Sequence, residues 1–448
     1  MTSTREDIII PNMWLRRLLQ VTLILILGGF ALTRDTQPRF DPRWQARFFT
    51  RAYEFDYVTW TVDALARKLA HFSTGSSAYL SEPEQVQVVL TYLDLVSDLR
   101  RVEGQINQIF ANPDIEDPHS FSSDLRQELD RLRQQRARLA PLAEAVLQGQ
   151  VSEVLAEMGF GVAGQPLPPV LYRTTPLPVA LIISPREVIR QDADISLIPD
   201  LTVDQKASLE EQVDDTLDVS SLVVNIGGIG LYPAMIQETT DINWLTEVVA
   251  HEWTHNYLTL RPLGASYLAS PQLRTMNETA AGIAGKEIGL EVVRRYYPQY
   301  LPPPPDPTPP PIQPDLVDPE PTQPPAFDYR AEMHVTRLTV DELLAEGKID
   351  EAESYMEERR RIFWDNGFQH LRKLNQAYFA FYGAYADQPG GAAGDDPVGE
   401  AVRRLREDSP DLASFLFRIS WMSSFEQLQN TLSAGTGSPA GYALGTNP

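Results

Sequence analysis

The 448-residue sequence contains no cysteine. Without thiolates, disulfide scaffolds, thiolate zinc fingers, iron–sulfur clusters and cysteine nucleophiles are all excluded. A transition-metal site in this chain must therefore be built from His, Asp and Glu side chains. Histidine is also scarce, with six in the whole sequence, so a short motif that uses two of them is informative.

Basic residues are few relative to acidic ones. The chain has 38 Lys and Arg against 61 Asp and Glu, which leaves a formal net charge of −23. Proteins that bind nucleic acid present a basic face, so this balance argues against nucleic acid as a partner. The length predicts two or three domains rather than one small core.

A long apolar run occurs at the N-terminus. Residues 14–32 read WLRRLLQVTLILILGGFAL, with Arg16 and Arg17 near the start and Arg34 just after the run. A helix needs about 20 apolar residues to span a bilayer, and this run is only slightly shorter. By the positive-inside rule we expect a single-pass membrane protein whose N-terminus is cytoplasmic and whose remainder lies outside the cytoplasm. A cleaved signal peptide is the alternative, although no clean A-x-A cleavage site follows.

The remaining sequence predicts a predominantly helical α+β fold. Apolar stripes beginning at Val96 and Leu125 predict an antiparallel helical hairpin. The β-branched runs at 168–184 and 220–236 predict a small sheet, with a polar helix at 201–217 between them. We expect six regions. The first three are a cytoplasmic N-terminus with the membrane anchor (1–35), a helical region with the hairpin (36–160) and a zinc-binding catalytic region (161–300). The last three are a proline-rich spacer (301–327), a C-terminal helical part of the catalytic unit (328–432) and a disordered tail (433–448).

The motif that carries chemistry is His251-Glu252-Trp253-Thr254-His255, inside a predicted helix at 241–258. On a helix, residues four apart lie on the same face, so both imidazoles can reach one zinc ion. Glu252 lies about 100° around the helix, where it can act on a zinc-activated water without being a ligand. Zinc lowers the pKa of such a water towards about 7, and Glu252 would accept its proton as general base.

A catalytic zinc site requires a third protein ligand and one open position. The metzincin pattern would need Gly and His where this chain has Leu258 and Arg261, so that class is excluded. The next predicted helix, at 271–297, contains Asn277-Glu278-Thr279-Ala280-Ala281, followed by two further acids, Glu287 and Glu291.

HEWTH followed by NETAA resembles the gluzincin clan of zinc metallopeptidases, which have H-E-x-x-H and then N-E-x-x-A on the next helix. The resemblance implies that Glu278 is the third zinc ligand and that Asn277 helps to position the site. Glu287 and Glu291, farther along the same predicted helix and without a preceding Asn, are the rival ligands. It also implies a substrate-binding edge strand before the metal helix. The segment 223–236 occupies that place, and glycines such as Gly228 would let a peptide backbone pair with it. A glycine-rich turn between core strands is the alternative.

Residues 374–385, LNQAYFAFYGAY, resemble a segment with the pattern L-N-N-A followed by Tyr in a family of bacterial predicted aminopeptidases. This sequence departs from the pattern by having N-Q-A. The resemblance implies that Tyr385 stabilises the developing oxyanion and that Asn375 is a positioning residue. Tyr378, Tyr382 and His370 are the alternative donors.

The sequence thus predicts a membrane-anchored zinc peptidase, aminopeptidase-like, that acts on a peptide or protein substrate. An aminopeptidase also needs a group that captures a free α-amine, for which Glu247 and Glu332 are candidates. The alternative function is a non-catalytic, envelope-associated scaffold with a residual or structural metal site, in which the hairpin and the proline-rich segment would be the working parts.

Overall fold

A computed structural model describes residues 42–72, 79–111, 117–162, 164–302, 327–368, 371–386 and 391–435. The predicted membrane segment at 14–32 and most of the proline-rich spacer lie outside these ranges. Within them, no helix is both long enough and apolar enough to cross a membrane. The predominantly helical α+β class predicted from the sequence is confirmed.

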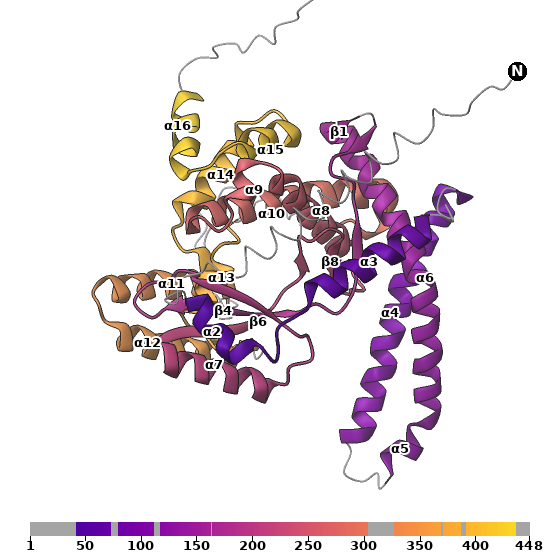
Figure 1. Cartoon of the computed structure of the whole chain (residues 1–448), viewed down its shortest axis with the longest axis horizontal. Coiled ribbons are helices and arrows are strands. Elements are labelled where there is room, and N and C mark those ends of the chain that lie inside the picture. Colours follow the sequence, from indigo (N-terminus) through magenta and orange to yellow (C-terminus); the bar gives the residue numbers. More distant parts are fainter. Residues whose placement is uncertain are drawn as a thin grey trace, which may run out of the picture.

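Two long helices run side by side as an antiparallel hairpin (Figure 1). They are α4 (Glu82–Ala111) and α6 (Ser123–Leu155), with the short α5 (Pro118–Phe121) at the far end. The apolar stripes predicted from the sequence meet along this hairpin, where Val102 of α4 and Leu132 of α6 are both buried. Because apolar residues recur every three or four positions on each helix, each presents one continuous face to the other.

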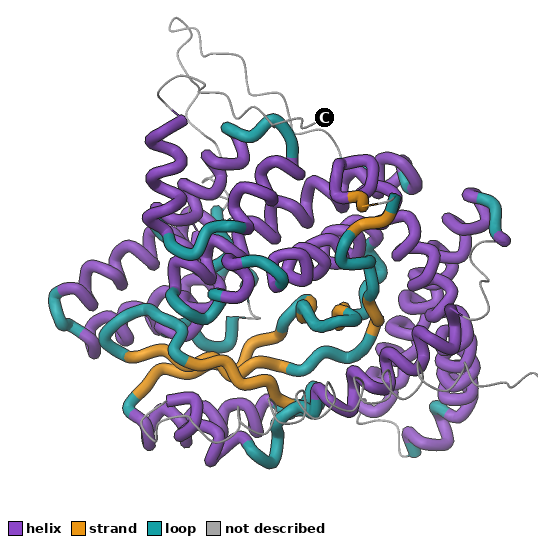
Figure 2. Tube along the Cα trace, turned by 45° about the horizontal axis from the view of Figure 1, so that its top comes forward, coloured by secondary structure: helices purple, strands orange, loops and turns teal. Residues whose placement is uncertain are grey.

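A three-stranded antiparallel sheet in the order β5-β4-β6 lies between two layers of helices (Figures 1 and 2). Its strands are β4 (Val179–Pro185), β5 (Ala193–Leu197) and β6 (Val219–Asn225). Alternate residues point to opposite faces of a strand. Leu181 and Ile183 therefore pack with α2 (Pro42–Thr50) and α7 (Val203–Leu217), whereas Ala180 and Ile182 pack with helices on the other face. Those helices are α11 (Tyr329–Ala345), α12 (Ile349–Asp365) and α13 (Gln376–Tyr382).

A second sheet, in the order β3-β8-β7, lies beside the first and has three short strands. They are β3 (Tyr172–Thr174), β7 (Gly228–Ile229) and β8 (Ala234–Ile236), and a two-stranded hairpin, β1 (Gly161–Val162) with β2 (Gln165–Pro166), follows α6. The sequence predicts a single small sheet here and does not predict β5. That strand is five residues long, with Ile195 as its one β-branched residue, so its local signal is weak.

The two helices predicted to carry the metal ligands are α8 (Ile242–Thr259) and α10 (Pro271–Tyr296). Helix α8 begins after Asp241, whose carboxylate accepts hydrogen bonds from two backbone N–H groups of the first turn. Both helices belong to the largest apolar core, which also includes the base of the hairpin. The remaining helices that pack against them are α9 (Pro262–Ala265), α14 (Pro397–Glu407), α15 (Leu412–Ser420) and α16 (Phe425–Gly435), whereas α3 (Tyr57–Phe72) packs against α6. Helix α16 continues past residue 433, where the tail was predicted to begin.

Candidate metal centre

Helices α8 and α10 approach so closely that two glycines of α10 have no room for a side chain. A Cβ at Gly285 would lie 2.9 Å from the carbonyl oxygen of Glu247, and a Cβ at Gly289 would lie 2.7 Å from the Glu247 nitrogen. The Thr246 hydroxyl also donates a hydrogen bond to the Gly289 carbonyl at 3.3 Å. These two glycines lie about two and about three turns beyond Glu278, so the closest approach is farther along α10 than the NETAA segment.

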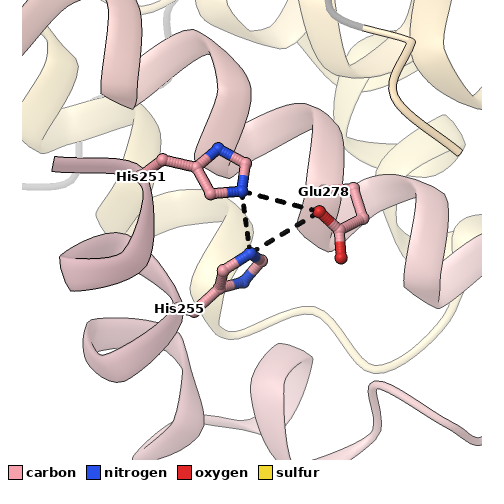
Figure 3. A group of neighbouring side chains, drawn as sticks. All are labelled: His251, His255 and Glu278. Atoms are coloured by element: carbon pink, nitrogen blue, oxygen red, sulfur yellow. Dashed lines mark hydrogen bonds and ion pairs between the residues drawn. The ribbon is translucent and has the colours of Figure 1, made fainter. Parts of the chain in front are cut away.

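His251 and His255 of α8 converge on Glu278 of α10 (Figure 3). The two Nε2 atoms are 3.0 Å apart. The Oε2 atom of Glu278 lies 3.7 Å from Nε2 of His251 and 3.5 Å from Nε2 of His255. Two imidazole nitrogens and one carboxylate oxygen, all within 4.8 Å of one another, form a donor set that can hold a transition metal.

The two oxygens of the Glu278 carboxylate have different surroundings. Its Oε1 accepts a hydrogen bond from the Tyr267 hydroxyl, whereas its Oε2 is buried without a hydrogen-bond partner among the described residues. This oxygen meets the two histidine nitrogens as ion pairs without a hydrogen bond, and a buried carboxylate oxygen that lacks a hydrogen bond costs free energy. Because Oε2 faces both Nε2 atoms, a cation at the centre of the group would supply the missing interaction. The residues therefore fit a metal ion.

Asn277 fixes the orientation of one histidine ring. Its side chain is 2% exposed, and its Oδ1 lies 2.8 Å from Nδ1 of His255. An amide oxygen can only accept, so Nδ1 carries the proton and Nε2 of the neutral ring keeps its lone pair for a metal. Asn277 thus lies where the resemblance to gluzincins implies a positioning residue.

The ionisation of the metal-free group follows from burial and from Glu278. Burial would lower the pKa of His255, but the charge of Glu278, together with hydrogen bonds, outweighs it and raises the pKa to about 9. Burial would likewise raise the pKa of Glu278, yet the two histidines hold it well below its usual range. At neutral pH the metal-free site therefore pairs a protonated His255 with an ionised Glu278.

Glu252 lies next to this group but does not belong to it. Its side chain is buried, and burial raises its pKa in spite of the two neighbouring histidines. Together with the three candidate ligands it lines a cavity of about 470 Å³. A carboxylate with a raised pKa beside a metal position is suited to accept and return a proton.

Two glycines on the other side of this cavity make room for the motif. A Cβ at Gly228, on the edge strand β7, would lie 2.3 Å from Oε1 of Glu252. A Cβ at Gly230 would lie 2.9 Å from Cβ of His255. The sequence prediction explains Gly228 by the approach of a substrate backbone. In the structure its lack of a side chain first accommodates Glu252 itself.

Tyr385 faces the metal-ligand group across the same cavity. Its ring stacks on the His251 ring, with centroids 6.5 Å apart and an interplanar angle of 27°. Desolvation of its hydroxyl, and next the charge of Glu278, raise the pKa of Tyr385 well above its usual value, although the residue as a whole is 38% exposed. The hydroxyl is therefore a proton-bearing donor throughout the neutral range. Among the alternative donors, Tyr378 bonds instead to the Tyr329 hydroxyl at 2.8 Å, Tyr382 does not line the cavity, and position 370 lies outside the described residues.

Asn375 does not line the cavity. It caps α13 by accepting a hydrogen bond from the Tyr378 N–H at 3.0 Å, and its amide donates to the Ser221 carbonyl of β6 at 2.9 Å. These bonds tie the start of α13 to the sheet. The segment that ends in Tyr385 is held in place from that point.

The other acids considered from the sequence lie elsewhere. Glu287 forms an ion pair with Arg406 at 2.7 Å, and Glu291 pairs with Arg294, so neither is positioned as the third ligand. The candidates for amine capture, Glu247 and Glu332, do not line the cavity.

Several polar residues of the cavity lie outside the sequence motifs, among them Arg274, Tyr267 and Asp194. Arg274 precedes Glu278 by one turn of α10, so helical periodicity alone could have identified it. Tyr267, in the loop before α10, and Asp194, on the weakly predicted β5, carry no local signal. Tyr267 is found only through its bond to Glu278.

No protein-family model matches the chain, and neither does any curated protein or solved structure. The site combines a partly buried group of two nitrogens and one oxygen, the buried carboxyl group of Glu252 beside it and the phenol of Tyr385 facing it across a cavity.

Proposed function

We propose that this protein is a zinc-dependent peptidase of the gluzincin type, with His251, His255 and Glu278 as the metal ligands. The observation that carries the proposal is the buried Oε2 of Glu278, which has no hydrogen-bond partner in the described part of the chain and faces both Nε2 atoms. Two histidines and one glutamate, open to a cavity on one side, are a donor set of catalytic zinc sites.

Zinc bound there would supply an activated water molecule and polarise a substrate carbonyl. Glu252 accepts a proton from the attacking water as its oxygen adds to the carbonyl carbon. The same carboxyl then gives that proton to the nitrogen of the leaving amine as the C–N bond breaks. Tyr385, whose hydroxyl keeps its proton, donates a hydrogen bond to the oxyanion that develops.

The joint presence of base, ligands and hydroxyl in one cavity favours the enzyme over a non-catalytic scaffold, which requires neither Glu252 nor Tyr385. The proposal includes the membrane anchor at 14–32, with the catalytic part outside the cytoplasm. The apolar run and its flanking arginines support this arrangement.

The proposal is tested by zinc content and by digestion of a peptide library with the purified full chain. We expect about one zinc per chain after loading and dialysis. Cleavage should be abolished by a chelator and restored by zinc, and His255→Ala should lose both metal and cleavage. The proposal would be overturned if the loaded protein held less than one zinc per chain and if His255→Ala left that amount unchanged.

Zinc binding at pH 7 should release about one proton. Because the pKa of His255 in the metal-free protein is about 9, its imidazole is protonated at pH 7 and must lose that proton to become a ligand. Apparent zinc affinity should therefore rise about tenfold per pH unit from pH 7 and level off above the His255 pKa. Calorimetry in buffers of different ionisation enthalpy counts the protons. A flat affinity between pH 7 and that pKa would contradict the pairing of His255 with Glu278.

A further inference from the structure

A second acidic side chain faces the metal centre from the sheet. Asp194 lies on β5, where burial alternates along the strand. Ala193, Ile195 and Leu197 point into the core shared with α2 and α7. Asp194 and Ser196 consequently point to the opposite face, where they line the cavity that holds His251, Glu252 and Glu278.

Among the residues that the structure describes, the Asp194 carboxylate has no counter-ion in contact. Within the described ranges its side chain takes part in no hydrogen bond and no ion pair. Arg274 and Arg43 act on it only through their charges, and one guanidinium nitrogen of Arg274 already donates to the Ala380 carbonyl at 2.8 Å. Desolvation outweighs these charges and raises the pKa of Asp194. A desolvated carboxylate without a partner is unfavourable unless a ligand brings a cation to it.

The cation that every unblocked peptide carries is its α-ammonium group. In the N-terminal residue this group is separated from the first carbonyl carbon by one Cα atom, so both fit inside a cavity of about 470 Å³. Glu278 is committed to the metal and Glu252 to proton transfer, which leaves Asp194 as the remaining acid of the lining. The apolar side chains of Ala180, Ile226 and Phe381 lie in the same lining and suit an apolar N-terminal side chain.

We propose that Asp194 binds the α-ammonium group of the substrate, so that the enzyme removes the N-terminal residue of peptides. This inference rests on the proposed zinc peptidase and adds its substrate class. Asp194 holds the amine, the first carbonyl lies at the metal centre, and the bond that breaks is the first peptide bond. A blocked N-terminus leaves Asp194 desolvated and unpaired, which is why such substrates are rejected.

The first test compares leucine 7-amido-4-methylcoumarin with its N-acetylated form, using the zinc-loaded full chain. We expect kcat/KM to favour the free amine by at least about 100-fold. Asp194→Asn should lower kcat/KM for the free amine about 10- to 100-fold and should not lower it for the N-acetylated substrate, because the variant has no unpaired charge at this position. Asp192→Asn is the matched control, because Asp192 precedes the same strand, pairs with Arg190 and does not line the cavity.

The second test measures binding without turnover. Leucine hydroxamate and N-acetyl-leucine hydroxamate carry the same metal-binding group and differ only in the charged amine. We expect calorimetry to show about 10- to 100-fold tighter binding of the free amine to the wild-type protein. Asp194→Asn should bind the two equally. Equal binding by the wild-type protein would overturn the role of Asp194.

The outcomes separate the two proposals. Zinc-dependent cleavage of blocked and free substrates at equal rates would overturn the aminopeptidase assignment and leave the zinc peptidase standing. Absence of zinc-dependent cleavage of these substrates and of the peptide library would overturn the proposed function itself. The wild-type comparison of free and blocked substrates decides the assignment even where Asp194→Asn fails to fold.

Discussion

Glu252→Gln should lower peptide hydrolysis by about 10²- to 10⁴-fold while the zinc content of the protein stays unchanged. Glutamine has the size and shape of glutamate but cannot accept the proton of the attacking water. Glu252 is not among the three residues whose ligand atoms converge, so its replacement leaves the metal-binding group intact. Steady-state kinetics and metal analysis on the same preparation measure both quantities.

The same substitution has a predictable effect on stability. In the metal-free protein, burial raises the pKa of Glu252 above its value in the unfolded chain. A raised carboxyl pKa means that the ionised form destabilises the fold, fully so at pH values above the folded pKa. Glutamine removes that charge, so at pH 7 the metal-free variant should melt at the same temperature as the wild type or higher.

A matched control is Glu247→Gln, on the same helix but outside the cavity lining. It should retain wild-type hydrolysis. If Glu252→Gln kept full activity, or if it lost zinc, the assignment of Glu252 as general base would be wrong.

Glu278→Ala should weaken zinc binding strongly. Loss of a residue that only orients a ligand weakens metal binding about 10- to 100-fold, and loss of the ligand itself should exceed that. The substitution removes one of three ligands and also removes the acceptor of the Tyr267 hydroxyl. Competition with a chromophoric chelator measures the affinity. Hydrolysis measured at subsaturating zinc should fall in parallel.

Glu291→Ala provides the control on the same helix, because Glu291 forms a solvent-exposed pair with Arg294. Such pairs contribute about 0–1 kcal/mol, so both folding and zinc affinity should be unchanged. Equal losses of zinc in the two variants would show that Glu278 is not the third ligand.

The sequence predicts those parts of the fold whose periodicity is long and regular. The hairpin of α4 and α6 follows from apolar residues repeated over many turns, as at Val96 and Leu125. The H-E-x-x-H spacing likewise places His251 and His255 on one helical face, where the structure has them. In both cases the information lies within one helix.

Features that depend on contacts between distant segments are harder to predict from the sequence. Nothing adjacent to Asp194 in the sequence indicates that it reaches the cavity, since β5 is short and its partner β4 supplies the register. Tyr385 could be chosen over Tyr378 and Tyr382 only by resemblance, because all three lie within one aromatic stretch. The structure separates them by position: Tyr378 lies within α13 and bonds to Tyr329, whereas Tyr385 follows the end of the helix and lines the cavity.

The contact of α8 with α10 at Gly285 and Gly289 has a consequence for the order of assembly. Backbone atoms meet there directly, so the spacing of the two helices is determined without any ion between them. The polypeptide can thus complete its folding first and acquire its metal afterwards, unlike small zinc domains that remain unfolded until they are loaded. If the proposed zinc site is correct, maturation of the protein depends on metal supply in the compartment where the folded chain resides.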